Sequence, residues 1–142
     1  MSISQRLARP LFAGIFIMGG LDSARNPAGK VEKADAVVPK ITEPLGLSGD
    51  TATFVRVNGV AQLVAASAFA LGVLPRLAAG TLFATLVPTT LAGHRFWEED
   101  SAAARNAQEL QFLKNLAIMG GLLLAMTGPR TSRRPGRPRT HR

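Results

Sequence analysis

Four apolar stretches, separated by polar segments, run along this chain of 142 residues. Residues 57–74 and 77–93 contain no charged side chain. An α-helix rises about 1.5 Å per residue, so a stretch of this length nearly spans a hydrocarbon core of about 30 Å. The pattern therefore predicts membrane-spanning helices at about 55–74 and 77–93. Because only Pro75-Arg76 separates their apolar stretches, we expect the two to form an antiparallel hairpin.

The apolar stretches nearest the two ends of the chain predict two further spans. The one at about 110–128 has Lys114 and Asn115 in its first turns, and Gly128-Pro129 is a helix stop. The one near the N-terminus reaches a spanning length only if the helix covers about 3–21. Arginines in its first two turns then reach the headgroups with their long side chains.

The segment 3–21 has a rival interpretation as a cleaved signal peptide, with arginines, a short apolar core and then Ser23. Asp22 and the lack of an A-x-A site before Ser23 favour a retained span. Pro10 then lies inside the helix, where we expect it to cause a kink.

These stretches together predict an all-α fold, an integral membrane four-helix bundle over residues 1–129. Residues 22–53 are interpreted as a polar loop with several prolines, in which short interfacial helices are one option. Residues 130–142 are predicted to be a disordered basic tail, because they are arginine-rich and of low complexity.

The composition is typical of a membrane protein. Apolar residues make up 46% of the chain and charged residues only 18%, yet the net charge is +8, so the charges are confined to certain segments. A nucleic-acid binder instead carries its basic residues on a soluble core. The chain has no cysteine, which excludes disulfides, thiolate metal sites and cysteine nucleophiles.

The distribution of charge predicts that both termini are cytoplasmic. In a four-span chain the termini share a side with Pro75-Arg76, and that side is basic and has no acidic residue. We expect the tail to bind anionic lipid headgroups through Arg130, Arg133, Arg134, Arg137 and Arg139. The Gly-Arg-Pro sequence in this tail resembles a minor-groove hook, but a membrane tether argues against a nucleic-acid partner.

Asn58 and Gln62 are polar residues within the predicted span 55–74, four residues apart and thus on one helix face. Two interpretations are open. They line a pocket for a polar headgroup or a quinone, or they form interhelical hydrogen bonds worth about 1 kcal/mol that fix packing. Gly19-Gly20 and Gly59 predict close contact between helices.

Residues 93–100, G-H-R-F-W-E-E-D, follow directly on an uncharged stretch. His94 and Glu98 have the i, i+4 spacing of a helical metal or proton site, but a metal site needs further ligands, so no metal is predicted. His94 remains a candidate pocket residue, together with Lys114 and Asn115. We expect Lys114 to pair with Glu98 or Glu99.

The same segment is better interpreted as an interfacial anchor of aromatic and ion-pairing residues. Its members are Arg95, Phe96, Trp97, Glu98 and Glu99. The aromatic side chains would lie at headgroup level, and Arg95 and Glu99 have the spacing of an i, i+4 ion pair. His94 would then end the preceding helix, where the helix dipole favours its cation.

Residues 58–98, NGVAQLVAASAFALGVLPRLAAGTLFATLVPTTLAGHRFWE, and 111–124, QFLKNLAIMGGLLL, together resemble the DoxX family of small bacterial membrane proteins. The richness in Arg, Ala and Gly suggests an actinobacterial member. The resemblance implies a four-helix membrane bundle linked to membrane redox systems, as with the related small subunit of thiosulfate:quinone oxidoreductase. Many relatives carry a glutamate near the position of Gln62. An amide there takes up no proton at neutral pH, so no catalytic residue is assigned.

Two functions are therefore considered. One is a non-catalytic or quinone-linked subunit of a membrane oxidoreductase assembly in oxidative-stress or sulfur metabolism, with a redox protein as partner. The other is a non-enzymatic membrane scaffold or a protein that handles lipids or small molecules. No cofactor is evident from the sequence, and quinone is the one candidate, because an apolar cleft with a few hydrogen-bonding groups is enough to hold it.

Overall fold

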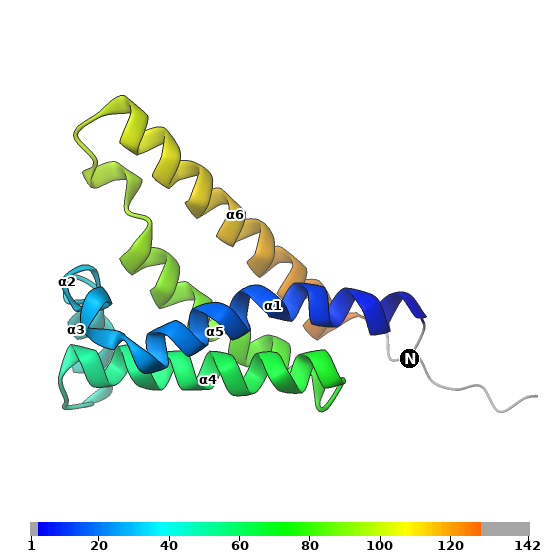
Figure 1. The fold of residues 1–142 in the computed structure, drawn as a ribbon. Coiled ribbons are helices and arrows are strands. Elements are labelled where there is room, and N and C mark those ends of the chain that lie inside the picture. The colour runs from blue at the N-terminus through cyan, green and yellow to red at the C-terminus, as the bar shows by residue number, and fades with distance from the viewer. Residues whose placement is uncertain (1–2, 129–142) are drawn as a thin grey trace, which may run out of the picture.

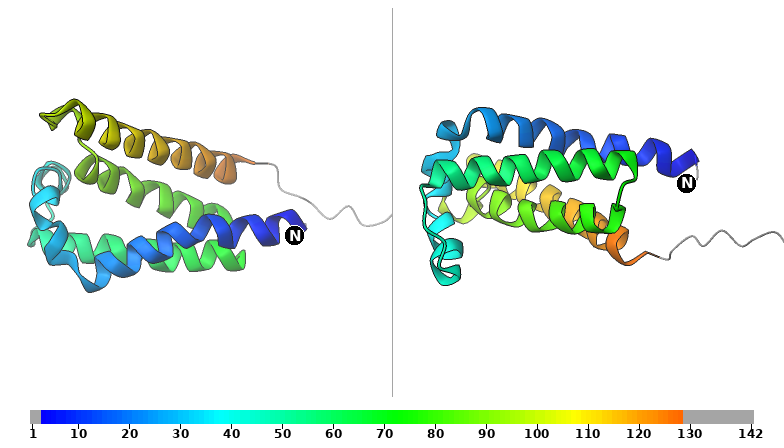
Figure 2. Two further views of the ribbon diagram at one scale, coloured as in Figure 1. Left: turned by 45° about the horizontal axis from the view of Figure 1, so that its top comes forward. Right: turned by 90° about the horizontal axis from the view of Figure 1, so that it is seen from below.

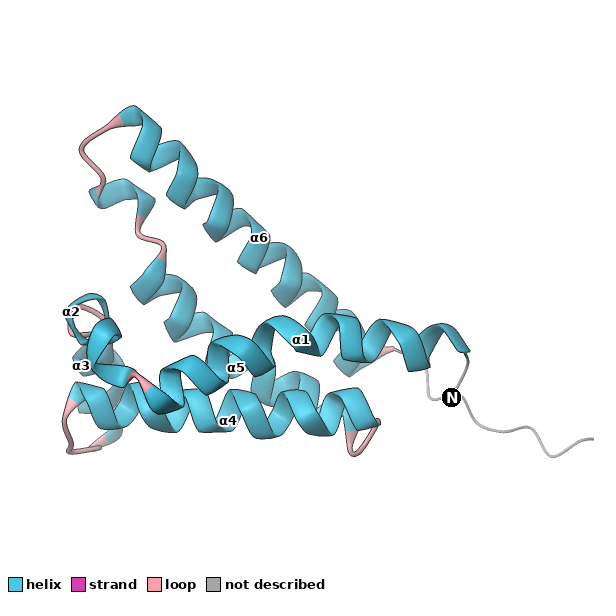
Figure 3. Cartoon of the chain, in the orientation of Figure 1, coloured by secondary structure: helices cyan, strands magenta, loops and turns pink. Residues whose placement is uncertain are grey.

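The computed structural model describes residues 3–128, and within that range the chain is helical apart from turns and short connections (Figure 1 and Figure 3). The long helices are α1 (Ile3–Arg25), α4 (Thr51–Leu71), α5 (Pro75–Gly93) and α6 (Ala102–Thr127). α1 and α4 lie side by side, α5 packs on α4, and α6 packs on α5 and diverges from α1 and α4 toward its own start. The all-α prediction is confirmed.

The hairpin between α4 and α5 turns three residues earlier than predicted. α4 ends at Leu71 and is followed by Gly72, whose φ of 75° is left-handed, and α5 begins at Pro75. Pro75 and Arg76 therefore form the first turn of α5 instead of separating the helices. This is where proline is favoured, because its missing N–H has no partner there in any case. Leu74, with a φ of 41°, completes the turn.

Both outer long helices extend beyond their apolar stretches. α1 runs without a break through Pro10 and continues to Arg25, past the predicted end at residue 21. α6 begins at Ala102 instead of residue 110, and the Ser101 side chain accepts a hydrogen bond from Ala104 N at its start. The apolar pattern indicates only the part of a helix that fits the hydrocarbon core. The ends of the helix depend on capping residues and on polar residues that favour helix formation.

The predicted polar loop, 22–53, folds into short helices in its central part, which agrees with the option of short helices there. These are η1 (Pro27–Lys30), α2 (Val31–Ala34), α3 (Val38–Thr42) and η2 (Glu43–Leu45). We call residues 27–45 the cap. It buries Ala34, Val37 and Thr42, and α2 contacts both α4 and α5. Single apolar residues spread among charges gave no periodic signal for it.

The start of α4 is fixed by Asp50, whose carboxylate accepts a hydrogen bond from Thr53 N. Hydrogen bonds from Thr53, from its hydroxyl first and its backbone second, hold the pKa of the Asp50 carboxyl below its ordinary value. The carboxylate also carries the charge that the positive end of the helix dipole favours. Asp50 thus fixes the start of α4, and α4 contacts η1, α2 and α3 of the cap.

α1 and α4 approach most closely at two glycines. A Cβ built on Gly20 would lie 2.7 Å from Gly59 O, and one built on Gly59 would lie 2.8 Å from Gly20 O. A Cβ on neighbouring Gly19 would meet nothing within 4 Å. The expected packing role is thus confirmed for Gly20 and Gly59, and Gly19 has no part in it.

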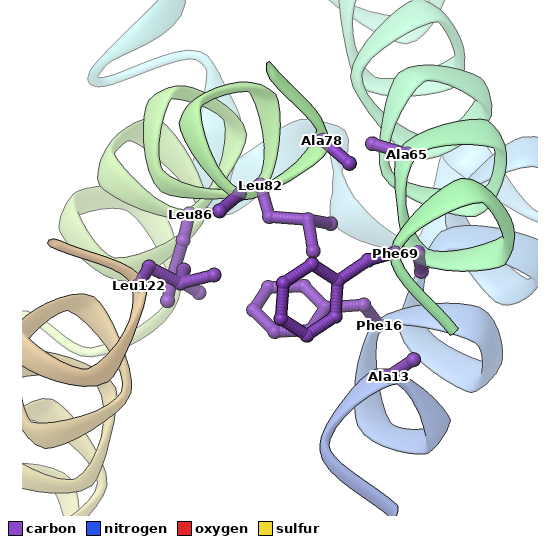
Figure 4. Close-up of a cluster of buried hydrophobic side chains, with 10 residues drawn as sticks. Ala13, Phe16, Ala65, Phe69, Ala78, Leu82, Leu86 and Leu122 are labelled. Carbon is purple, nitrogen blue, oxygen red and sulfur yellow. The ribbon is translucent and has the colours of Figure 1, made fainter. Parts of the chain in front are cut away.

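The core lies where α1, α4 and α5 meet, and α6 closes one side. Figure 4 shows Phe16 of α1 and Phe69 of α4 beside Leu82 of α5, with Leu122 of α6 farther along. Leu122 is the one residue of α6 that is fully buried in the described range. Ile118, Met119 and Met126 of α6 pack against this core while partly buried, whereas the leucines on its other face, such as Leu113 and Leu124, are exposed, as is Leu11 of α1.

By length and composition, α1, α4 and α6 are able to cross a membrane. α5 is not among the helices of residues 3–128 that meet this description. Its first turn carries Arg76, and its length includes Pro88 and several threonines, which lower its mean hydropathy. The described structure thus supports a membrane protein with three such helices, and the predicted fourth span stays a prediction.

Candidate ligand cavity

A cavity of about 630 Å³ lies between α4, α5 and the cap. Small-molecule sites typically measure about 300–1,000 Å³. Much of the wall is apolar, with Val37 and Ile41 from the cap, Phe54 and Val57 from α4, and Pro88 from α5. Figure 2 shows the cap at the end of the molecule where α4 begins, so the cavity lies toward that end.

A few polar residues interrupt this apolar wall. Asn58 and Thr89 belong to the facing helices α4 and α5, His94 follows the last residue of α5, and Lys30 and Lys33 come from the cap. An apolar enclosure with a small number of hydrogen-bonding groups is typical of sites that orient an amphipathic molecule. Of the predicted pocket residues, Asn58 and His94 therefore line this cavity.

Thr89 connects α4 to α5 through one hydroxyl. Its Oγ1 accepts from Asn58 Nδ2 at 3.1 Å and from Gln62 Nε2 at 3.4 Å, and it donates to Thr85 O at 2.8 Å. A hydroxyl has one proton and two lone pairs, so all three are used. The interhelical hydrogen bonds predicted for Asn58 and Gln62 are thus present.

The structure also separates these two amides. Gln62 is only 4% exposed and does not line the cavity, whereas Asn58 is partly exposed and does. Each amide donates one N–H to the Thr89 hydroxyl. The second N–H and the carbonyl oxygen of Asn58 have no hydrogen-bond partner in the described part of the chain. Gln62 therefore serves packing, and Asn58 can serve both packing and a ligand.

Thr90, the next residue, connects α5 to α6 in the same way. Its buried hydroxyl accepts from Asn115 Nδ2 at 3.0 Å and donates to Leu86 O at 2.7 Å. Asn115 is thus placed between helices and does not line the cavity. Pro88 has no N–H, so the carbonyl of Ala84 lacks its usual helical partner. The Thr89 and Thr90 hydroxyls do not replace this partner, because they donate to the carbonyls of Thr85 and Leu86.

Lys114 does not form the predicted ion pair. It is exposed, and neither of the ion pairs found among residues 3–128 involves it. The prediction rested on the short connection between the two predicted spans, which brings their ends near each other. α5 ends at Gly93, and a separate short turn, η3 (Phe96–Glu98), follows, in which Glu98 pairs with Arg95 instead.

His94 ends α5 as predicted, with its backbone N–H donating to Thr90 O. Its Nδ1 lies 2.8 Å from Gln108 Oε1. A carbonyl oxygen only accepts, so this hydrogen bond assigns the proton to Nδ1 and leaves Nε2 for another partner. The sequence did not identify Gln108, because it lies in the polar start of α6, beyond the predicted span.

The residues of the predicted interfacial anchor lie close together, but their ion pair differs from the predicted one, and their place at the headgroups stays a prediction. Arg95 Nε lies 3.2 Å from Glu98 Oε2, so the partner is Glu98 and not the predicted Glu99. The predicted pair has the i, i+4 spacing of an α-helix, whereas residues Phe96–Glu98 form a 3-10 turn, in which side chains at i and i+3 lie close together. Phe96 and Trp97 form edge-to-face pairs with Phe112 of α6, at ring-centroid distances of 5.5 and 6.0 Å. This cluster fixes the connection between α5 and α6.

No group of three or more histidine, aspartate or glutamate side chains in residues 3–128 is placed to hold a metal ion. A metal site built on His94 and Glu98 would therefore lack a third histidine or carboxylate ligand within that range. The tail arginines, Arg130, Arg133, Arg134, Arg137 and Arg139, lie outside the described residues, as does Pro129.

Comparison with known families gives one match. The DoxX family model matches residues 5–95, which include α1, the cap, α4 and α5. The match stops before α6, so the resemblance proposed for residues 111–124 stays a prediction. No curated protein and no solved structure matches the chain at a significant level.

Proposed function

The chain belongs to the DoxX family, and from this premise we propose that it is a multi-pass subunit of the cell membrane that holds a small amphipathic molecule. The molecule would occupy the cavity between α4, α5 and the cap. The observation that carries the proposal is a half-open, largely apolar cavity of about 630 Å³ whose polar contacts come from a few side chains, Asn58 among them. Quinones belong to this chemical class, and the proposed setting is a membrane oxidoreductase assembly.

We further propose four spans with both termini in the cytoplasm. α5 is as long as a short span, and residues 77–93 are uncharged. The start of α1, the α4–α5 turn and the end of α6 share one end of the molecule (Figure 1), where Arg76 donates to Gly128 O. Basic residues without acidic neighbours at that end favour the cytoplasmic side.

A non-enzymatic scaffold is the second candidate, and one observation favours it. Thr89 accepts hydrogen bonds from Asn58 and Gln62, and Thr90 accepts one from Asn115, so these polar groups already hold three helices together. On this reading the polar residues of the spans contribute to packing alone.

Separate Asn58→Leu and Gln62→Leu variants distinguish the two. If the cavity holds a ligand, Asn58→Leu lowers the affinity for an added quinone by roughly three- to tenfold, because one hydrogen bond contributes about 0.5–1.5 kcal/mol. Gln62→Leu, one turn farther along α4 and outside the cavity wall, lowers thermal stability and leaves the affinity unchanged. Titration in nanodiscs and thermal unfolding measure the two effects. Equal loss of stability with unchanged affinity in both variants would support the scaffold.

A further inference from the structure

The charges on the cavity wall all have one sign. Lys30 and Lys33 are the charged side chains that line it, and no aspartate or glutamate lines it within the described residues.

The two lysines are not equivalent. Lys30 Nζ contacts the Asp22 carboxylate, which Asn26 Nδ2 also reaches at 3.1 Å. Lys33, one turn along α2, is exposed and forms no ion pair with any residue in the range 3–128. The cavity therefore has one lysine that is already neutralised and one whose charge is available.

We infer that the cavity selects an amphiphile with an anionic head, such as a single-chain carboxylate, and holds the head at Lys33 and Lys30 with the chain between α4 and α5. This inference rests on the proposed function and narrows the class of its ligand. The apolar wall from Phe54 to Pro88 accepts a hydrocarbon chain. A neutral quinone would leave the Lys33 ammonium group unmatched.

The proposed membrane arrangement is consistent with this assignment. If α1 and α4 cross the membrane, the cap that follows α1 and precedes α4 lies at the headgroup end of both helices, and the wall of α4 and α5 extends from there toward the hydrocarbon. Anionic heads of lipids lie at the same depth, and a basic residue there attracts them with about 1 kcal/mol. An anionic amphiphile can therefore enter sideways without removing its head from the interface.

The test uses the full chain in nanodiscs of neutral phosphatidylcholine at pH 9, where carboxylates are ionised and most lysines stay charged. Oleate is titrated against oleyl alcohol, which has the same chain and no charge, with empty nanodiscs as the blank. Lys33→Gln should weaken oleate binding about fivefold, the equivalent of about 1 kcal/mol, and leave oleyl alcohol unchanged. Asp22→Asn should strengthen oleate binding, because it releases Lys30 from its carboxylate.

Lys40→Gln is the matched control, since Lys40 is an exposed lysine of the same cap that does not line the cavity. It should leave oleate affinity unchanged. Equal weakening by Lys33→Gln and Lys40→Gln would overturn the inference in favour of general charge attraction. Tighter binding of a quinone or of oleyl alcohol than of oleate would also overturn it, although the proposed function would stand. Binding of none of these ligands would contradict both.

Discussion

A Gly20→Val variant should lose roughly 1–3 kcal/mol of stability or more and separate α1 from α4. Even the first atom of the new side chain would lie 2.7 Å from Gly59 O and 2.9 Å from Leu63 N. Both are backbone atoms of a continuous helix, so neither can move without shifting α4 as a whole. Thermal unfolding in detergent, with crosslinking between α1 and α4, measures the loss.

Gly19→Val is the control for this prediction, because it makes the same change one residue earlier in α1. A Cβ there meets nothing within 4 Å, so the helix propensity changes equally and the packing does not. Its unfolding temperature should stay close to that of the unchanged protein. Similar losses in the two variants would show that α1 and α4 do not pack through Gly20.

Thr89→Val should destabilise the protein by about 1–2 kcal/mol, because it removes the acceptor shared by Asn58 and Gln62. The Gln62 amide is almost fully buried, so its N–H would be left without a partner and without water. The change is nearly isosteric, which limits any effect of volume. Chemical unfolding in mixed micelles measures the difference.

Thr81→Val, two turns earlier on α5, provides the comparison. The Thr81 hydroxyl donates only to Leu77 O of its own helix, so its loss leaves no interhelical group unpaired. We expect a change several times smaller than that of Thr89→Val. Equal effects would assign the stability to bonds within α5 and not to the contact between α4 and α5.

The long helices could be predicted because each contains an apolar stretch near the length of a bilayer core. Their ends could not, since Asp50, Gly72 and Ser101 act through local hydrogen bonds and backbone conformations that hydropathy does not register. Short helices in the cap were one option, but their positions could not be predicted, for a related reason. Residues such as Ala34 and Val37 are buried singly, by contact with α4 and α5, and a lone apolar residue has no period.

Only part of the candidate site could be predicted from the sequence. Asn58 and Gln62 stood out as polar residues in an apolar span, and the structure places both at Thr89. Which of them lines a cavity depends on the cap, whose position the sequence did not reveal. Lys33 was not considered for the same reason, since it appeared to be one of many charges in a loop.

The most direct measurement is the mass-spectrometric identification of small molecules that remain with the protein when it is extracted in native lipid. Ala92 lines the cavity, so Ala92→Phe should fill part of it, whereas Ala84→Phe makes the same change on an exposed part of α5. We expect the unchanged protein and Ala84→Phe to retain the same amphiphile and Ala92→Phe to lose it. Retention in all three proteins to the same degree, or in none, would contradict a ligand in this cavity.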